Sequence, residues 1–234
     1  MQIPFLNRWH PTIALRYLPM IKEIDRDESV LEVGSGSLGV GPYLKRSFTG
    51  VDLDFPGPNW PKMKKVKASA TKLPFKDNSF DVVVNSDVLE HLPKKDRQTA
   101  INEMARVCKK KLIIGVPIGE KAHIQDKKLD QLYLDKLGKR HPFLEEQVEL
   151  GLPEIKDIEK SIQESFKKYE KNFQIEIIPN MNLKMRMWLM RGWMSESKIA
   201  DLFFRKALLI AIPFMALFNS PPTYRQIFIV KIVN

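Results

Sequence analysis

The sequence predicts an α/β fold in which a mainly parallel sheet is covered by helices on both faces. Three observations carry this prediction. Short apolar runs typical of buried strands alternate with helical segments through the first half of the chain. A glycine-rich turn directly follows the first of these runs. The 234 residues are enough for one such domain with additional helices, and we expect residues 1–234 to form a single domain.

The elements of the first half follow from apolar periodicity and the residues that interrupt it. A helix is expected over residues 9–24, with a kink or break at Pro19, because proline removes a helical hydrogen bond. Strands are expected at residues 30–33, 50–53, 64–67, 80–85 and 112–116, and further helices at 40–47 and 94–108. Ligands of such sheets bind beyond the carboxyl ends of the strands, so the site is expected there.

The pattern changes after Pro117. Residues 119–171 are charged and helical in composition, a strand is expected at 173–178, and a Met- and Trp-rich helical segment follows before a last strand at 224–233. The predicted layout is a cofactor-binding core over 29–117, a helical substrate-cap insertion over 118–171, an apolar helical insertion over 181–222 and a final strand over 223–234.

The chain is basic, with 38 Lys and Arg against 28 Asp and Glu and a net charge of +10. This charge fits either a solvated basic surface or an anionic partner such as a phosphate-bearing substrate or a membrane surface. No nucleic-acid-binding motif accompanies it, so nucleic acid is the least favoured partner. A single cysteine, Cys108, fits a reducing, cytoplasmic compartment. We read no signal peptide, and the longest apolar stretch, residues 207–218, is shorter than the roughly 20 residues that span a bilayer.

The segment EVGSGSLG, residues 32–39, is the strongest local motif. Glycines let the backbone approach a nucleotide-like ligand, and the helix that follows directs free N–H groups at it. The glycine spacing alone also matches the dinucleotide fingerprint. Glu32 suits the cationic amino group of S-adenosylmethionine, whereas a pyrophosphate gains nothing from it. Asp52 ends the next strand and can accept from ribose hydroxyls of either cofactor; both carboxylates could instead cap helices or be solvated.

Three segments in this order, VLEVGSGSLG, GVDLD and ATKLPFKDNSFDVVVNSDVLEHLP, resemble the class I S-adenosylmethionine-dependent methyltransferases of the small-molecule type found in quinone and glycan pathways. The resemblance spans residues 29–117, and LPFKDNSFDVVV is its most specific part. It implies a Rossmann-like seven-stranded sheet, mostly parallel with an antiparallel last strand, and helical insertions after strands five and six. The segment YRQIFIVKIV, residues 224–233, fits that last strand.

The resemblance also implies a set of cofactor-binding residues at the strand ends: Glu32, Gly34, Ser35, Gly36, Gly39, Asp52, Leu53, Ser69, Ala70, Asn85 and Ser86. The glycine loop would hold the methionine moiety, Asp52 the ribose, and Leu53 would lie against the adenine. Ser69 stands where the family often has Asp, so the adenine amino group would meet a hydroxyl or the backbone. Asn85 and Ser86 would lie beside the transferable methyl group.

Methyl transfer from a sulfonium is an in-line displacement, so the protein mainly positions the acceptor and can remove its proton. His91 follows the fourth strand and is the candidate base, unless it only caps or packs at a helix start. Asp87, Glu90 and His91 stand at i, i+3 and i+4 and resemble the metal cluster of some O-methyltransferases. Leu-Glu-His-Leu also occurs in metal-free members, so we predict no metal.

The segment at residues 181–194, MNLKMRMWLMRGWM, and the apolar residues after it allow two interpretations. They could pack on the core, or they could form an apolar lip that accepts a lipid-linked substrate or contacts an anionic membrane. Basic residues stand among them, as in helices that lie at a membrane interface: Lys184, Arg186, Arg191, Arg205 and Lys206.

The function predicted from the sequence is methyl transfer from S-adenosylmethionine to a small-molecule or glycan acceptor. Oxygen is the expected acceptor atom, and the acceptor could be carried on a lipid or phosphate. Two alternatives remain open at this point: an NAD-dependent oxidoreductase, and a methyltransferase-like binding module without activity. The sequence identifies neither the acceptor nor an oligomeric state.

Overall fold

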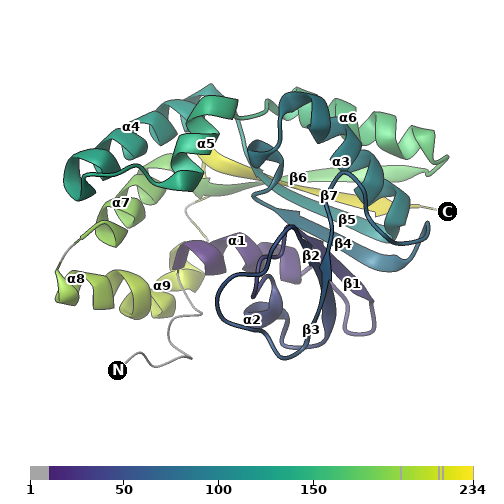
Figure 1. The fold of residues 1–234 in the computed structure, drawn as a ribbon, viewed down its shortest axis with the longest axis horizontal. Helices are drawn as coiled ribbons and strands as arrows, with labels where there is room; N and C mark the ends of the chain where they lie inside the picture. Colours follow the sequence, from purple (N-terminus) through teal and green to yellow (C-terminus); the bar gives the residue numbers. More distant parts are fainter. Residues whose placement is uncertain (1–10, 196, 216, 218, 234) are drawn as a thin grey trace.

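The computed structural model describes residues 11–195, 197–215, 217 and 219–233 (Figure 1). Its centre is a seven-stranded sheet with the strand order β3-β2-β1-β4-β5-β7-β6. The strands are β1 (Val30–Val33), β2 (Phe48–Asp52), β3 (Met63–Lys67), β4 (Phe80–Ser86), β5 (Cys108–Pro117), β6 (Phe173–Asn182) and β7 (Thr223–Ile232). The first five strands pair in parallel, and β7 is antiparallel to both β5 and β6. The predicted Rossmann-like architecture is confirmed.

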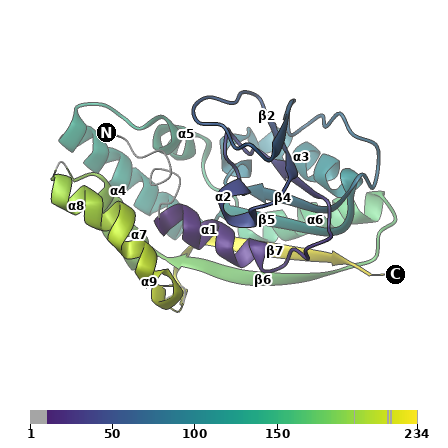
Figure 2. The same ribbon diagram turned by 90° about the horizontal axis from the view of Figure 1, so that it is seen from below.

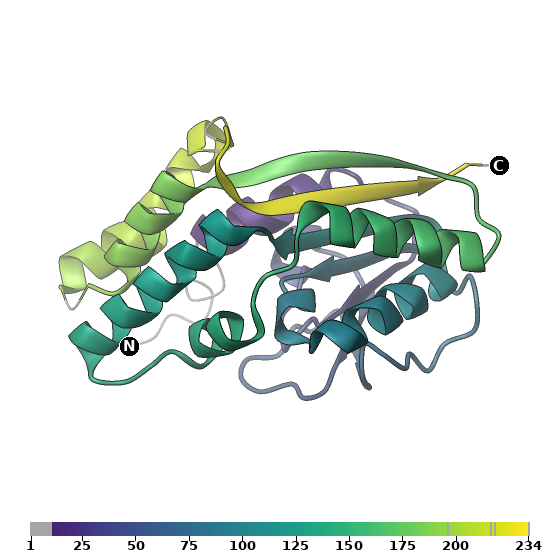
Figure 3. The same ribbon diagram turned by 90° about the horizontal axis from the view of Figure 1, so that it is seen from above.

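Helices cover both faces of the sheet, so the central strands are buried on both sides. On one face lie α3 (Lys94–Val107) and α6 (Ile155–Lys168), which pack against alternate residues of β1, β4, β5 and β7 (Figure 3). The other face is covered by α1 (Pro11–Ile21), α7 (Leu183–Trp193) and α9 (Leu208–Met215), and α1 and α9 lie side by side (Figure 2). Strands such as β1, with all four residues buried, suit this two-sided environment.

The predicted insertions lie after β5 and β6. The first contains α4 (Glu120–Leu137), α5 (Pro142–Leu150) and α6, and the second contains α7, α8 (Lys198–Leu202), η3 (Phe203–Ala207) and α9. Figure 1 shows that α4, α5 and α7, which belong to these two insertions, lie together beyond one end of the sheet. None of the helices in the described ranges is long and apolar enough to cross a bilayer.

Several element boundaries differ from the prediction. The helix expected at residues 40–47 is only α2 (Gly41–Leu44), because Lys45 takes a left-handed conformation with φ 61° and closes it. Cys108 begins β5 rather than ending a helix, since the basic run after it pairs with β4 and β7 despite its charge. The strand expected at 173–178 continues to Asn182, because β7 offers hydrogen-bonding partners as far as Thr223. The first two residues of the helix expected from residue 9 lie outside the described ranges.

Candidate active site

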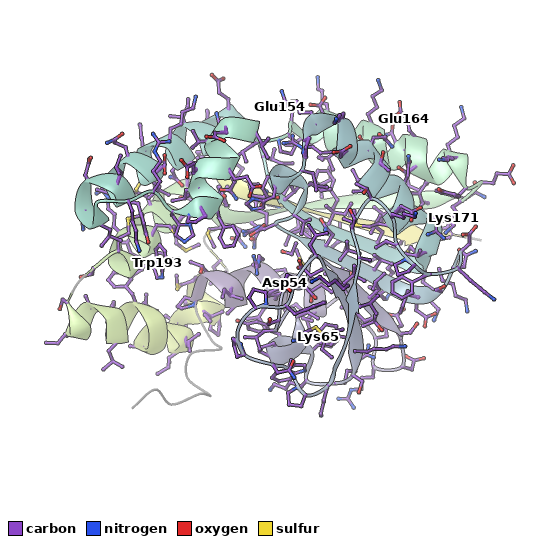
Figure 4. The ribbon with its side chains drawn as sticks, viewed as in Figure 1. Asp54, Lys65, Glu154, Glu164, Lys171 and Trp193 are labelled. Carbon is purple, nitrogen blue, oxygen red and sulfur yellow. The ribbon has the colours of Figure 1, made fainter. Side chains whose placement is uncertain are left out.

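A cavity of about 900 Å³ lies where the predicted site was expected, beyond the carboxyl ends of β1, β2 and β4. One wall comes from the glycine loop and the strand ends, and the other comes from α1, α5, α7 and β7. Figure 4 labels Asp54, beyond β2, and Trp193, among the insertion helices, which both line this cavity. Ten of the predicted residues line it: Gly34, Ser35, Gly36, Asp52, Leu53, Ser69, Ala70, Ser86, Asp87 and His91. A cavity of this size accommodates a small-molecule ligand or cofactor.

The glycine loop is held against the neighbouring strand by its own backbone. The N–H groups of Gly34 and Ser35 both donate to the carbonyl oxygen of Val51 in β2, at 2.7 and 3.1 Å. Gly34 has φ +79°, and a Cβ there would lie 2.1 Å from Val88 Cγ2. Gly36 has φ +53°, but no atom lies within 4 Å of its notional Cβ. The loop is therefore packed tightly at Gly34 and borders open space at Gly36, where a ligand can approach the backbone.

Glu32 lies behind the loop and does not line the cavity. Its side chain is fully buried, Oε1 accepts from the Tyr17 hydroxyl at 2.7 Å, and Oε2 accepts from the Val40 N–H at 2.6 Å. Gly39 does not line the cavity either; a Cβ at Gly39 would lie 2.0 Å from Glu32 Oε2. Glu32 therefore fixes the shape of the loop, and Tyr17, to which it is bonded, is the group that reaches the cavity wall.

Burial of Glu32 makes the stability of the protein depend on pH. Desolvation raises the pKa of Glu32 from 4.5 to about 7, despite the hydrogen bonds from Tyr17 and Val40. The folded protein holds this proton more tightly, so stabilisation is full below pH 4.5 and is lost as the pH rises through about 7. We expect the free energy of unfolding to fall by roughly 1–3 kcal/mol more between pH 5 and 8 in the wild type than in Glu32→Gln. Urea denaturation at the two pH values measures this difference. An equal fall in the free energy of unfolding in both proteins would contradict it.

Asp52 and Leu53 lie together at the end of β2. Asp52 Oδ2 accepts from the Gly36 N–H at 2.7 Å, and its Oδ1 accepts from the Leu53 N–H at 2.7 Å. Leu53 lines the cavity with 67% of its surface exposed, as suits a side chain that covers a flat apolar ring. Ser69 Oγ lies 2.8 Å from Thr71 Oγ1, so this hydroxyl, which replaces the usual Asp, is shared with a neighbour.

Two polar groups at the end of β4 lack partners. Asn85 is buried and donates from Nδ2 to the Val33 carbonyl at 3.0 Å, but its Oδ1 has no hydrogen bond. The buried Ser86 hydroxyl also has none, and it lines the cavity. An unsatisfied buried polar group costs about 1–3 kcal/mol, so the Ser86 hydroxyl is suited to a polar ligand atom. Together with Gly36, Asp52 and Leu53, it forms a donor and acceptor set that fits an adenosine joined to an amino acid.

Asp87 is held by two arginines that the sequence did not indicate. It accepts from Arg225 through two nitrogens, one of them Nε at 2.6 Å, and from Arg16 Nη1 at 3.0 Å. Burial alone would raise the pKa of Asp87, but the charges of Arg225 and Arg16 outweigh it and lower this pKa to about 2. Arg225 is 138 residues away along the chain, so no local pattern could have revealed the pairing. The carboxylate of Asp87 is therefore charged and already coordinated by guanidinium groups.

The three weak metal candidates do not converge. Asp87 faces arginines, while Glu90 is fully buried, and burial, followed by the charge of Asp87, raises the pKa of Glu90 well above its usual range. His91 Nδ1 lies 2.7 Å from Glu146 Oε2, on α5. Across the described ranges, no group of three His, Cys, Asp or Glu side chains is arranged to hold a metal ion.

His91 belongs to a short 3₁₀ helix, η2 (Leu89–His91), and lines the cavity with its side chain 20% exposed. His141, in the first insertion, also lines the cavity, whereas His123 does not. Cys108 is buried, which raises the pKa of its thiol to about 12 and leaves it outside the site.

The expectation that Arg186 belongs to an interfacial basic face is wrong. Its side chain is buried, donates to Asp126 at 2.6 Å and to Gln125 at 2.9 Å, and lies 3.5 Å above the ring of Tyr224. Arg186 turns inward because a buried carboxylate and an aromatic face together offset its desolvation. Lys184 and Arg191 of the same helix are exposed, and the side chains of Arg205 and Lys206 lie outside the described part of the structure.

Residues 31–114 match the family model described as a methyltransferase domain. Residues 31–114 therefore form a class I S-adenosylmethionine-dependent methyltransferase domain. The cofactor of this methyltransferase is therefore S-adenosylmethionine. The match supports a methyltransferase rather than the alternative of an NAD-dependent oxidoreductase.

Two curated proteins and several solved structures are similar to this methyltransferase. A fatty-acid O-methyltransferase of Mycolicibacterium smegmatis is 36% identical over 116 residues, which cover 44% of this chain and 41% of that protein. An uncharacterised protein of Haemophilus influenzae is 34% identical over 99 residues, 36% of this chain and 39% of its own. The chain thus spans about two fifths of the length of both relatives.

The similarity to a solved structure extends over nearly the whole methyltransferase. A SAM-dependent methyltransferase of Thermotoga maritima superimposes with a TM-score of 0.53 at 15% identity, covering 98% of this chain and 92% of that one. At this identity the likeness concerns the fold, including the helices beyond the matched domain.

Proposed function

We propose that this methyltransferase transfers a methyl group from S-adenosylmethionine to an oxygen of a small-molecule or glycan acceptor. The observation that carries the proposal is a single cavity that joins the cofactor-binding residues to His91 and to the insertion helices. The similarity to the fatty-acid O-methyltransferase of Mycolicibacterium smegmatis supports oxygen as the acceptor atom. An apolar or lipid-linked acceptor is consistent with Phe143, Met190 and Trp193 in the cavity wall.

The roles of the residues follow from their positions. When bound, the cofactor supplies an electrophilic methyl group. The loop at Gly34–Gly36, with Asp52, Leu53 and Ser86, would bind and orient it. His91 would accept the proton of an acceptor hydroxyl, while the insertion helices would enclose the acceptor and exclude water. A screen of free and lipid-linked sugars, phenols and fatty acids with mass detection of methylated product tests the proposal. Transfer to amines alone would refute oxygen as the acceptor atom.

The cofactor site is tested by Asp52→Ala. Hydrogen bonds to a charged group contribute about 1.5–3 kcal/mol, so we expect S-adenosylhomocysteine to bind roughly 10- to 150-fold more weakly. Isothermal titration calorimetry measures the change, with Asp77→Ala as the matched control, because the exposed Asp77 pairs with Arg106 at 2.8 Å and does not line the cavity. Unchanged affinity in folded Asp52→Ala would remove this carboxylate from the ribose site.

We further propose that α8, η3 and α9 contact an anionic membrane surface. Large apolar side chains are exposed along this segment, with Ile199 and Ile210 each 83% exposed: Ile199, Leu202, Phe203, Ile210, Phe214 and Leu217. Soluble proteins rarely expose such a concentration of apolar surface without a partner. On the adjacent α7, the exposed Lys184, Trp188 and Arg191 stand one turn apart, which combines positive charge with an interfacial aromatic residue.

Co-sedimentation with vesicles containing anionic lipid tests this surface. Each basic residue near such a membrane contributes about 1 kcal/mol, so Lys184→Glu with Arg191→Glu should lower binding by at least tenfold, and added salt should weaken the wild type. Ile210→Asp with Phe214→Asp should also abolish binding. Ile155→Asp, at a partly exposed isoleucine on α6, is the control. Absence of wild-type binding at low salt would refute the membrane contact and leave an apolar surface for another role.

A further inference from the structure

Three side chains on one side of the insertion helix α5 contact His91. Phe143, Glu146 and Gln147 stand at i, i+3 and i+4, so their side chains project from the same side of the helix. The Phe143 ring meets the imidazole edge to face, with 5.6 Å between centroids. Glu146 Oε2 lies 2.7 Å from Nδ1 of His91, and Gln147 Nε2 lies 3.4 Å from its Nε2. A single helix therefore contacts both nitrogens of the imidazole and packs an aromatic ring against it.

The two polar contacts assign the same tautomer to the imidazole. A carboxylate can only accept, so the Nδ1 that faces Glu146 carries the hydrogen. The amide nitrogen of Gln147 can only donate, so the Nε2 that faces it carries the lone pair. A neutral imidazole has one nitrogen of each kind, and this arrangement satisfies both. The weaker contact is on the Nε2 side, where 3.4 Å is long for a hydrogen bond.

The orientation of Gln147 is fixed in turn from the core. The hydroxyl of Tyr224, in β7, donates to Gln147 Oε1 at 3.3 Å, and Glu90 Oε1 lies 3.5 Å from Gln147 Nε2. Gln147 is buried and lines the cavity, so its amide marks where an acceptor would meet His91. Tyr224 of the sheet therefore orients the Gln147 amide that contacts Nε2 of His91, while the exposed Glu146 contacts Nδ1.

We propose that Glu146 is the positioning residue that holds His91 as a base, with Nδ1 protonated and Nε2 directed at the acceptor. The inference rests on the proposed oxygen methylation. An acceptor hydroxyl replaces the long contact from Gln147 and gives its proton to Nε2. The oxygen then bonds to the methyl carbon as the carbon–sulfur bond breaks, with that electron pair going to sulfur. The imidazolium that forms lies against the Glu146 carboxylate, which stabilises its positive charge.

The tautomer of His91 tests this assignment without any acceptor. The chain has four histidines, and ¹⁵N spectra of ring-labelled protein, assigned with His91→Ala, distinguish Nδ1–H from Nε2–H in the neutral ring. We expect the Nδ1–H form in the wild type, and a shift toward Nε2–H in Glu146→Ala. Glu146→Gln should retain Nδ1–H, because its amide oxygen still accepts. Glu149→Gln, one turn along α5 and exposed, should change nothing.

Turnover provides the second readout. Misplacement of a catalytic group costs up to about 10²-fold, so Glu146→Ala should lower kcat by roughly 10- to 100-fold with unchanged affinity for S-adenosylhomocysteine, and Glu146→Gln should recover part of it. A tautomer unchanged in Glu146→Ala would overturn the role of Glu146. A shifted tautomer in a protein that methylates no oxygen acceptor would leave that role intact and refute the proposed function instead.

Discussion

Turnover in His91→Ala is expected to fall by about 10²–10⁴-fold, the range typical of the loss of a general base. The imidazole lines the cavity next to the end of β4, where an acceptor can reach both it and the cofactor site. Affinity for S-adenosylhomocysteine should stay unchanged, because the side-chain contacts of His91 are with α5 and not with the glycine loop or Asp52. Single-turnover methyl transfer, together with calorimetry, distinguishes the two effects.

His123→Ala is the matched control for this prediction. His123 belongs to the cap insertion and does not line the cavity, so its loss should leave turnover near the wild-type value. Near-normal turnover in His91→Ala would show that no base is needed, as for an acceptor that is already a carboxylate. That result would reduce His91 to a packing role and direct the search toward acids of the fatty-acid type.

The second large effect is expected on stability rather than on chemistry. Asp87→Ala removes the carboxylate that the buried Arg225 and the half-buried Arg16 share, and leaves both guanidinium groups without their counter-charge. Breaking a buried ion pair on one side costs about 3–5 kcal/mol, so the free energy of unfolding should fall by that amount. Urea denaturation near neutral pH measures it, since Asp87 is fully ionised there.

A surface pair supplies the control for Asp87. Asp54→Ala breaks only the exposed contact with Lys67, and such pairs contribute about 0–1 kcal/mol. Replacing both partners should cost less than replacing one, so Asp87→Ala with Arg225→Met should recover part of the loss. A loss below 1 kcal/mol in Asp87→Ala would mean that the two arginines find other partners or reach water.

Local patterns in the sequence were sufficient for the sheet and for the glycine loop. β1 and β4 are rich in buried apolar residues, and the loop requires glycine at Gly34 because Val88 fills the space of a Cβ. What the sequence could not provide is how distant segments meet. Glu32 was expected in the cavity wall, but it is buried and accepts hydrogen bonds from Tyr17 and Val40. No motif in α1 indicated the contact between Tyr17 and Glu32.

The acceptor end of the site was hidden for the same reason. Glu146 and Gln147 stand in a charged insertion with no recognisable pattern, and only the packing of α5 against η2 brings them to His91. Arg186 looked like part of a basic interfacial stripe, but its guanidinium turns toward Asp126 and Tyr224. Periodicity describes which side of a helix is apolar; it does not say which charged side chains find buried partners.

The position of β7 determines when the site can assemble during synthesis. This strand comes last in the described chain, but it lies between β5 and β6, and its Tyr224 and Arg225 form part of the cavity wall. As the polypeptide leaves the ribosome, the edges of β5 and β6 stay unpaired until residues 223–232 emerge, and Asp87 lacks Arg225 until the same moment. Pairings between segments so far apart in sequence form slowly. The acceptor chamber of the nascent methyltransferase therefore cannot be completed before residues 223–232 have emerged.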